Sequence, residues 1–378
     1  MTKLKIFACF LLLLCSVPAF ASVSVNVADA GFYFSPGNWY ISGTSYALTP
    51  SAGAYFYFRG TFTDATMGLD TSALGSNPLI MRCSLDGSAW SDSDIQGLSS
   101  IQLVGSAANT DHTVTCVYRG RTGIDSWNTP SDGWKITGLT LNTGATTTAP
   151  AVKPCKMLIL GDSRVEGRNL LSIGEAAAQD ATLAIPFMIG SAYRCEIGVV
   201  AYAALGWGSI GVTNVPPLFT PSDDTNSSWN KIFSGHSRTF GTAYDYIVEL
   251  DIGGADYNNS VSDATVTASV AGFLPALRAA APSAKIIVVL SYDGKKNSAI
   301  TAGYVAYQNS TPDRNATLVD PALSATEVAL IFGPTCGTAN LLTTDCVHPN
   351  TYGQSQIGSK VLQRMQVWLA LMRILIAN

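Results

Sequence analysis

The sequence predicts two structural units, a β-sandwich over residues 22–149 and an open parallel α/β sheet over residues 150–378. The chain has 378 residues, more than the roughly 250–300 residues that one hydrophobic core supports. Its first half reads as short strands between turns, whereas its second half alternates strand-like and helix-like segments. A tract rich in threonine and alanine, residues 143–150, has the composition of a linker between them.

Composition and charge exclude several classes of protein. Hydrophobic residues make up 47% of the chain and charged residues 13%, whereas intrinsic disorder requires low hydrophobicity and high charge. The formal net charge of −4 argues against a nucleic-acid partner, because such a partner selects a basic surface. The same charge argues against a polybasic protein of the membrane surface.

Residues 1–21 have the pattern of a cleaved secretory signal peptide. Lys3 and Lys5 precede an apolar run over residues 6–17, and residues 19–21 form a small-x-small cleavage site. The run is shorter than the about 20 residues that a transmembrane helix needs, and no later stretch is long and apolar enough to span a bilayer. We therefore expect a secreted or periplasmic protein without a membrane span.

Six of the eight cysteines lie after the signal segment. An even number of cysteines in an exported protein suggests disulfides. We expect the pairs 83–116, 155–195 and 336–346, because this pairing keeps each bridge within one unit. The chain has no Cys-x-x-Cys pair and no Cys/His cluster with the spacing of a zinc site, so no metal is predicted.

The first unit contains segments rich in aromatic and β-branched residues, separated by turn residues. They are residues 23–27, 39–48, 55–62, 79–85, 113–118 and 134–141. Short strands at regular spacing predict an antiparallel sandwich, of which the jelly roll is one form.

The second unit alternates two kinds of segment. Strands are expected over residues 157–160, 197–204, 246–252, 285–291 and 317–320, and helices over residues 165–179, 264–281, 300–308 and 351–376. This alternation predicts a parallel sheet. Because ligands bind at the carboxyl ends of the strands in such sheets, we expect the functional residues there.

The first strand of this sheet ends in Gly161-Asp162-Ser163. A serine at this place would lie near backbone N–H groups and a helix dipole that can stabilise a developing oxyanion. Alone, the tripeptide fits a serine that caps a helix better.

A serine nucleophile needs a base, and the base needs an orienting acid. The chain has three histidines. His112 reads as a surface turn residue of the first unit, and His236 lies in a polar loop with no acid nearby. His348 follows Asp345 by three residues, before the last helix. A lone histidine beside a turn aspartate would look the same, but elimination favours His348 with Asp345.

Two further strand ends carry glycines. Gly206 follows the second strand, where a backbone N–H could approach a substrate, although an ordinary loop glycine is equally compatible. Residues 253–256 follow the third strand and could simply be a turn. Ser209 is a rival nucleophile in a Gly-x-Ser-x-Gly-like segment, but Trp207 occupies the first glycine position.

Over about residues 155–378, the chain resembles the SGNH (GDSL-type) hydrolase family in the order of four motifs. They are Gly-Asp-Ser, the glycine loop, Gly-x-x-Asp and Asp-x-x-His. The resemblance implies a flavodoxin-like three-layer α/β/α fold and ester hydrolysis through an acyl-enzyme. It implies Ser163 as nucleophile and as one oxyanion donor through its N–H, His348 as general base and Asp345 as the orienting acid. Such a mechanism requires no cofactor.

The resemblance also implies the rest of the oxyanion hole. Gly206 matches the family's second donor, with Gly208 as the alternative. The third donor of the family is an asparagine, but Ala255 stands in its place. Either the reaction is slower, by about 10²–10³-fold for one lost donor, or another group such as Asn258 or Asn259 replaces it.

The first unit resembles the jelly-roll modules that precede the catalytic domain of some carbohydrate esterases. Five aromatic residues of this part of the chain could stack on sugar rings, or they could belong to the hydrophobic core. They are Tyr55, Tyr57, Trp90, Trp127 and Trp134. Together the two resemblances imply an exported serine esterase that removes ester groups, with O-acetyl groups of a carbohydrate as the expected substrate. The alternatives are a lipase- or thioesterase-like hydrolase of longer acyl chains and a glycan-binding protein with an impaired hydrolase domain.

Overall fold

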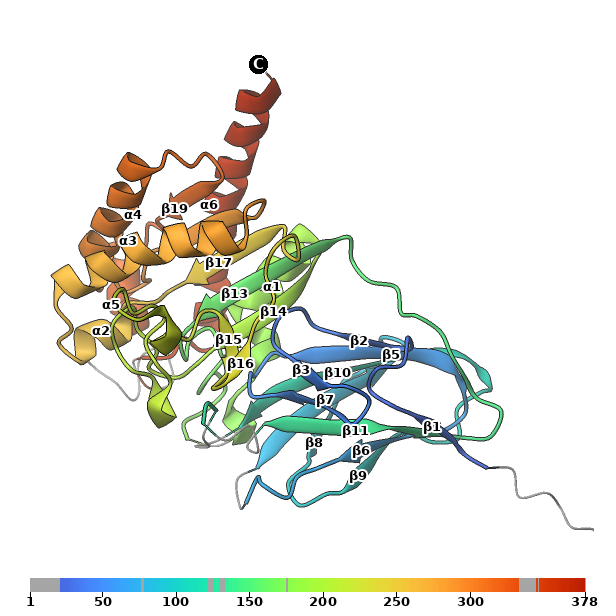
Figure 1. Cartoon of the computed structure of the whole chain (residues 1–378). Coiled ribbons are helices and arrows are strands. Elements are labelled where there is room, and N and C mark those ends of the chain that lie inside the picture. Colours follow the sequence, from blue (N-terminus) through green and yellow to red (C-terminus); the bar gives the residue numbers. More distant parts are fainter. Residues whose placement is uncertain are drawn as a thin grey trace, which may run out of the picture.

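The described residues form a mixed α/β structure with two larger antiparallel sheets, one parallel sheet and a two-stranded hairpin (Figure 1). The computed structural model describes residues 21–75, 78–121, 126–128, 133–174, 176–332, 345 and 347–377. Within them, no helix is long and apolar enough to cross a membrane.

The antiparallel sheets contain six strands each. The first has the order β3 (Tyr40–Ser42), β4 (Tyr46–Thr49), β11 (Trp134–Leu141), β6 (Ala65–Leu69) and β9 (Ser100–Val104), with β1 (Val23–Val25) paired to β11. The second has the order β12 (Thr146–Thr147), β5 (Tyr55–Phe62), β10 (Thr110–Arg121), β7 (Leu79–Leu85) and β8 (Ser91–Asp94), with β2 (Phe32–Phe34) paired to β5.

The two antiparallel sheets pack face to face around one hydrophobic core. Phe56 of the second sheet and Met67 and Trp134 of the first belong to the same buried cluster. Burial alternates along β6, because successive side chains of a strand point to opposite faces. The strands predicted over residues 55–62, 79–85 and 134–141 are confirmed. The segment 39–48 forms two strands, β3 and β4, because the chain turns between them at Gly43 with φ of 54°.

The parallel sheet has the order β14 (Cys195–Ala201), β13 (Cys155–Gly161), β17 (Tyr246–Leu250), β18 (Lys285–Val289) and β19 (Ala316–Val319). In chain order this is 2-1-3-4-5, the order of flavodoxin-like sheets. The helices are α1 (Ile185–Tyr193), α2 (Gly254–Asn258), α3 (Asp263–Ala280), α4 (Asn297–Ser310), α5 (Ala325–Phe332) and α6 (Thr351–Ala377). A small hairpin is formed by β15 (Lys231–Phe233) and β16 (His236–Ser237).

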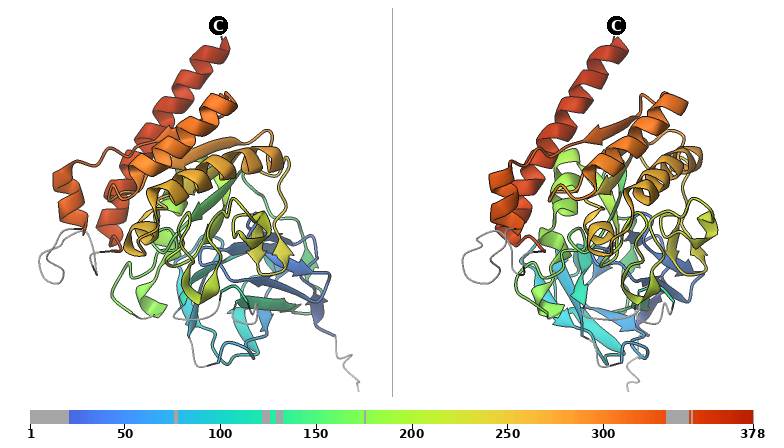
Figure 2. Two further views of the ribbon diagram at one scale, coloured as in Figure 1. Left: turned by 60° about the vertical axis from the view of Figure 1, so that its left-hand side comes forward. Right: turned by 90° about the vertical axis from the view of Figure 1, so that its left-hand side faces the viewer.

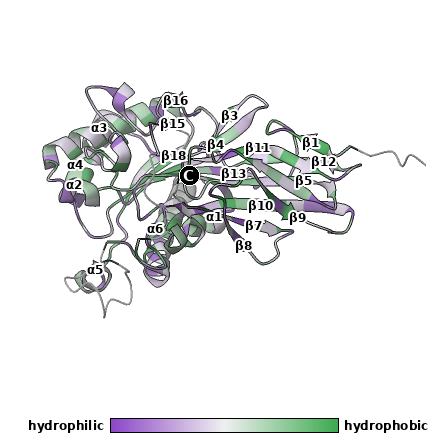
Figure 3. Ribbon diagram, turned by 90° about the horizontal axis from the view of Figure 1, so that it is seen from below, coloured by the Kyte–Doolittle hydropathy of each residue, from purple (hydrophilic) through white to green (hydrophobic). Residues whose placement is uncertain are grey.

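Helices cover both faces of the parallel sheet. Leu158 packs in one cluster with Phe273 of α3, and its neighbour Ile159 packs in another with Ile189 of α1 and Val361 of α6. These helices carry hydrophilic as well as hydrophobic residues (Figure 3), as expected for helices with one buried face. The C-terminal part of α6 extends beyond the sheet (Figure 2).

The prediction of a helix over residues 165–179 is wrong. The chain makes a series of turns there, followed by a 3₁₀ turn at Ala176–Ala178. Gly167, Asn169 and Gly174 all have positive φ, which an α-helix excludes. A Cβ at Gly167 would lie 2.8 Å from the carbonyl oxygen of Asp180, so this glycine permits a close approach of two chain segments. Helix α1, which was not predicted, begins beyond this region.

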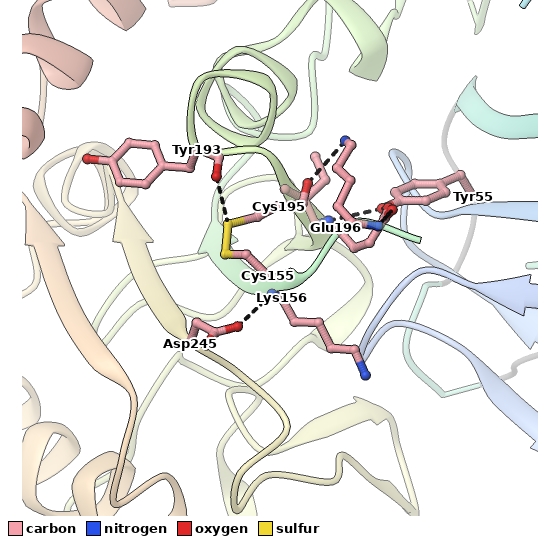
Figure 4. The surroundings of a disulfide bond; sticks show 9 residues. Tyr55, Cys155, Lys156, Tyr193, Cys195, Glu196 and Asp245 are labelled. Carbon is pink, nitrogen blue, oxygen red and sulfur yellow. Dashed lines mark hydrogen bonds between the residues drawn. A yellow bond between two sulfur atoms is a disulfide. The ribbon is translucent and has the colours of Figure 1, made fainter. Parts of the chain in front are cut away.

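Two of the three expected disulfides are confirmed. Cys83–Cys116 joins β7 to β10, and Cys155–Cys195 joins the first residues of β13 and β14 (Figure 4). In each case the two cysteines are register partners of neighbouring strands. The expected pair 336–346 lies outside the described residues.

The antiparallel unit covers the edge strand of the parallel sheet. The Ile197 N–H of β14 donates to the Tyr55 hydroxyl at 3.0 Å, and the Val199 carbonyl accepts from the Asn38 side chain at 3.3 Å. Between these two residues, a Cβ at Gly198 would overlap the carbonyl oxygen of Pro36. The first unit therefore binds the backbone of β14 directly.

Glu196 of the same strand anchors this contact. Its side chain accepts a hydrogen bond from the hydroxyl of Tyr55 (Figure 4). It also accepts hydrogen bonds from the Tyr57 hydroxyl and the Lys153 N–H. Because a buried carboxylate is costly without such donors, the two tyrosines stabilise the junction of the two units.

Candidate active site

Ser163 lies at the carboxyl end of β13, where the chain turns sharply. The Asp162 carbonyl accepts from the N–H groups of Val165 and Glu166, and the Asp162 side chain accepts from the Arg164 N–H at 2.8 Å. This turn holds Ser163 at the sheet edge with 8% of its surface exposed.

The structure brings together the three residues that the sequence selected. The Ser163 Oγ lies 2.9 Å from the His348 Nε2, and the His348 Nδ1 lies 2.7 Å from the Asp345 Oδ2. The other Asp345 oxygen accepts the backbone N–H of His348 at 2.7 Å. Asp345 therefore fixes both the backbone and the ring of the histidine.

Asn169 completes the surroundings of Asp345. Its side-chain amide donates to the Asp345 Oδ2 at 2.8 Å. Burial acts to raise the pKa of Asp345, but the hydrogen bonds from His348 and Asn169 lower that pKa well below its usual range. The carboxylate is therefore ionised at neutral pH. Sequence reasoning missed Asn169, because its orientation depends on a left-handed backbone conformation, with φ of 50°, inside the region predicted as a helix.

Arg164 connects the serine turn to the histidine loop. Its Nε donates to the Val347 carbonyl at 3.0 Å. Its two terminal nitrogens form ion pairs with Asp251 at 3.1 Å and with Asp293 at 2.8 Å, and the arginine and both aspartates are buried. At Asp251 burial raises the pKa although the Arg164 charge opposes this, whereas at Asp293 the Arg164 and Lys295 charges outweigh burial and lower the pKa to about 2.

The expected second oxyanion donors are already engaged. The Gly206 N–H donates to the Ser209 carbonyl at 3.1 Å, and the Gly208 N–H donates to the Asp256 carboxylate at 2.9 Å. Asp256 also accepts the N–H groups of Trp207 and Ser209 at 2.7 and 2.9 Å. The expectation that Gly206 or Gly208 presents a free N–H to a substrate is therefore not met, because this loop closes around Asp256.

A cavity of about 420 Å³ lies over Ser163 and His348. Its further lining residues include Arg168, Asn169, Ala203, Ala204, Gly254, Ala255, Asn258 and Asn259. Ala204 has a left-handed backbone with φ of 58°. Within the described part of the chain, the N–H groups of Ser163 and Ala204 donate no hydrogen bond, so both are available to a ligand.

The residues near the missing asparagine divide into two groups. Ala255 lies on the cavity wall, as does Asn258. The Asn259 amide donates to the Ser209 Oγ at 2.7 Å. The Asn258 amide, in contrast, forms no hydrogen bond with the described residues. The rival nucleophile Ser209 is buried, and its hydroxyl faces the Asn259 amide and the Ile210 carbonyl rather than a base.

The other two histidines lie outside this cavity. His112 is a buried residue of β10, where its ring contacts Asp86 at 2.7 Å and the Ala108 carbonyl at 2.7 Å. The expectation that His112 is a surface turn residue is wrong, because the residue belongs to strand β10 and is buried there. The ring of His236 packs against Tyr40.

The five aromatic residues considered for sugar stacking also divide. Tyr55, Trp127 and Trp134 are buried in the core or at the junction of the units. Tyr57 and Trp90 line a separate cavity of about 350 Å³ beside α1, and Trp90 is 49% exposed. Within the described residues, no group of three or more His, Cys, Asp or Glu side chains is placed to hold a metal ion.

No family model and no curated protein matches the chain. Solved structures do match. A family two carbohydrate esterase from Cellvibrio japonicus superposes with a TM-score of 0.69 at 14% identity, over 92% of this chain and 99% of that chain. An acetyl xylan esterase from the rumen bacterium Butyrivibrio proteoclasticus gives 0.69 at 13% identity, over 92% and 98%. A salicylyl-acyltransferase from a tetracycline biosynthetic pathway gives 0.62 at 12% identity, over 92% and 98%.

These likenesses extend over nearly the whole of each chain, so they include the antiparallel unit as well as the parallel sheet. The resemblance to SGNH-type hydrolases preceded by a jelly-roll-like unit is confirmed at the level of the fold. The chain therefore has the fold of the family two carbohydrate esterases.

Proposed function

We propose that the protein is a serine esterase that removes O-acetyl groups from a carbohydrate. One observation carries the proposal: the Ser163 Oγ, the His348 ring and the Asp345 carboxylate form a continuous chain of contacts of 2.9 and 2.7 Å at the wall of a cavity. This is the geometry that an activated serine requires.

In the proposed reaction, the Ser163 Oγ attacks the ester carbonyl carbon while His348 Nε2 takes the hydroxyl proton. The tetrahedral intermediate collapses by breaking the bond to the alcohol oxygen, which leaves with the proton from His348. A water then attacks the acyl-serine, again giving its proton to His348, and the carboxylic acid and free Ser163 are formed. The ionised Asp345 holds the Nδ1–H tautomer and stabilises the imidazolium.

The negative charge on the carbonyl oxygen needs hydrogen-bond donors. We assign the N–H groups of Ser163 and Ala204 to this role, because both residues line the cavity and both N–H groups lack an acceptor among the described residues. Asn258 is the third candidate through its side-chain amide. Gly206 acts indirectly, since it shapes the loop around Asp256.

The lining of the cavity favours a small acyl group on a polar alcohol. Arg168, Asn169, Asn258 and Asn259 contribute polar atoms to its wall, and its apolar lining consists of alanine and valine side chains. Such small side chains suit a short acyl group, whereas a long acyl chain needs an extended apolar groove. The carbohydrate esterases of the same fold support a carbohydrate as the alcohol. The intact contacts of Ser163 argue against a protein that only binds glycans.

We also propose that the protein is exported. The two disulfides support this, because disulfides persist mainly in oxidising compartments.

A chain-length series of esters tests the function. Purified protein is assayed on p-nitrophenyl acetate, butyrate and octanoate and for acetate release from acetylated xylan, with Ser163→Ala as the control. Turnover of acetate esters that disappears in Ser163→Ala supports the proposal. Preference for octanoate favours a lipase-like enzyme, and undiminished turnover by Ser163→Ala excludes Ser163 as the nucleophile.

A further inference from the structure

We propose that the substrate carries a carboxylate close to the scissile ester, and that Arg168, with Arg121 behind it, binds this carboxylate. The inference rests on the proposed esterase function and defines the class of substrate for the same site.

Arg168 lies on the wall of the catalytic cavity together with Ser163 and His348. It is held there because its backbone N–H donates to the Ser163 carbonyl at 3.0 Å. The residue is partly buried, and its guanidinium forms no ion pair or hydrogen bond with any residue that the structure describes. An arginine is a planar donor of five N–H groups that matches a carboxylate with two parallel bonds. Its free donors therefore face a cavity in which a substrate must bind.

Arg121 lies near Arg168 but does not line the catalytic cavity. Both arginines line a small inner cavity of about 20 Å³, next to the catalytic one, which has room for a single water-sized group. Arg121 is the last residue of β10 and is 5% exposed. Its Nη1 is buried with no hydrogen-bond partner, and its guanidinium has no ion-pair partner among the described side chains. The antiparallel unit thus supplies a second positive charge to this site.

One acidic side chain shares the inner cavity. Glu166 is buried, and its Oε2 has no hydrogen-bond partner in the described structure. Burial raises the pKa of Glu166, although the charges of Arg121 and Arg168 oppose this. Whatever its protonation, a single carboxyl group cannot neutralise two guanidinium groups. At least one positive charge of this pair remains unmatched.

Arg164 shows what a matched arginine looks like in the same region. Its charge is compensated by Asp251 and Asp293 through ion pairs of 3.1 and 2.8 Å. Asp162, which also lines the catalytic cavity, accepts the backbone N–H of Arg164 and belongs to that cluster. Since a partly buried charge is unfavourable without a counter-ion, the unmatched Arg168 indicates that the ligand brings the anion.

The carboxylate could belong to either side of the ester. A uronic acid carries it on the alcohol side, and a half-ester of a dicarboxylic acid carries it on the acyl side. Both kinds of substrate present a carboxylate to Arg168, so the experiment includes a charged ester of each kind.

The test compares charged and neutral esters of equal size. On the alcohol side, acetate release from the methyl glycoside of di-O-acetyl-galacturonic acid, with its carboxylate free, is compared with release from the methyl ester of the same glycoside. On the acyl side, p-nitrophenyl hemisuccinate is compared with p-nitrophenyl butyrate. We expect kcat/KM for the charged member of one pair to exceed that of the neutral member by about tenfold or more, and the ratio to fall as salt is added.

Variants identify the residues. Arg168→Gln should lower the charged-to-neutral ratio of kcat/KM by about tenfold, and Arg121→Gln should lower it less, because Arg121 lies behind. Arg314→Gln is the matched control, since Arg314 is exposed and lines neither cavity. Melting temperatures show which variants fold, and the wild-type comparison depends on none of them.

The outcomes separate this inference from the proposed function. Turnover of neutral and charged esters with equal kcat/KM in both pairs overturns the carboxylate site and leaves the esterase intact. A charge preference that survives in Arg168→Gln assigns the preference elsewhere and also overturns it. Absence of turnover on every ester contradicts the esterase itself, and the inference falls with it.

Discussion

The Arg164 Nε donates to the Val347 carbonyl at 3.0 Å, so the residue after the serine is bonded to the residue before the histidine. These two segments come from opposite ends of the parallel-sheet unit. The contact explains how a serine and a histidine 185 positions apart hold a 2.9 Å separation. Arg164 is therefore a positioning residue.

Replacing Arg164 should reduce both stability and turnover. Arg164→Gln leaves Asp251 without its cation and Asp293 with that of Lys295 alone, and a buried pair that loses one partner costs about 3–5 kcal/mol. Arg164→Lys keeps the charge, but an ammonium cannot reproduce the planar fork. We expect Arg164→Lys to be more stable than Arg164→Gln in urea unfolding while its kcat on p-nitrophenyl acetate still falls about tenfold or more. A wild-type kcat in the lysine variant would falsify the positioning role.

Restoring an amide at residue 255 should accelerate the reaction. Ala255 lies on the cavity wall at the position where the resembling family has an asparagine. Ala255→Asn adds a donor that can contact the oxyanion, so we expect kcat to rise, by up to about 10²-fold. Ala255→Leu is the control, because leucine has a similar volume and no donor. An equal effect of both substitutions on kcat would mean that packing, not hydrogen bonding, limits the rate.

The two glycines of the loop around Asp256 should differ in their tolerance of a methyl group. A Cβ at Gly206 would lie 2.5 Å from the Asp256 Oδ1, whereas a Cβ at Gly208 would meet Thr265 and Val261 side-chain carbons at 2.9 and 3.0 Å. The first contact displaces a carboxylate held by three N–H groups, and the second displaces only methyl groups. Gly206→Ala should therefore lower the melting temperature and kcat more than Gly208→Ala. The opposite ranking in calorimetry and kinetics would contradict this view of the loop.

Acid should weaken the buried Arg164 cluster through Asp293. The pKa of Asp293 is about 2 in the folded protein, below the about 3.9 of an unfolded aspartate. The unfolded state therefore binds this proton more readily, and the stabilisation is present above about pH 4 and is lost as the pH falls toward 2. In urea unfolding at pH 5, 4 and 3, Asp293→Asn should lose less stability than the wild type. Parallel losses in the two proteins would assign the acid sensitivity to other carboxylates.

The functional residues that could be predicted from the sequence lie next to regular strands and helices. Ser163 follows a buried strand directly, and Asp345 and His348 stand three apart before a long helix. Each signal is weak alone, and the order of the motifs along the chain together with elimination among the histidines selected these residues. The end of β13 places Ser163 at the edge of the sheet, whereas its contact with His348 also depends on the bond between Arg164 and Val347.

The residues that could not be predicted depend on irregular backbone. Asn169 contacts Asp345 from a left-handed conformation, and Ala204 presents its N–H from another. These conformations arise from tertiary contacts, such as the approach of Gly167 to the Asp180 carbonyl, and a local pattern contains no signal for them. The engagement of the Gly206 N–H is equally invisible in the sequence, because it depends on how the chain closes around Asp256.

The cover over β14 has a consequence for handling the protein. Tyr55 and Asn38 occupy the N–H of Ile197 and the carbonyl of Val199, groups that would otherwise be free to pair with a strand of another molecule. A fragment cut near residue 150 would expose that edge and would also lack Arg121. Trimming the chain to its hydrolase half would therefore favour self-association through this edge, so the two halves are best expressed and engineered together.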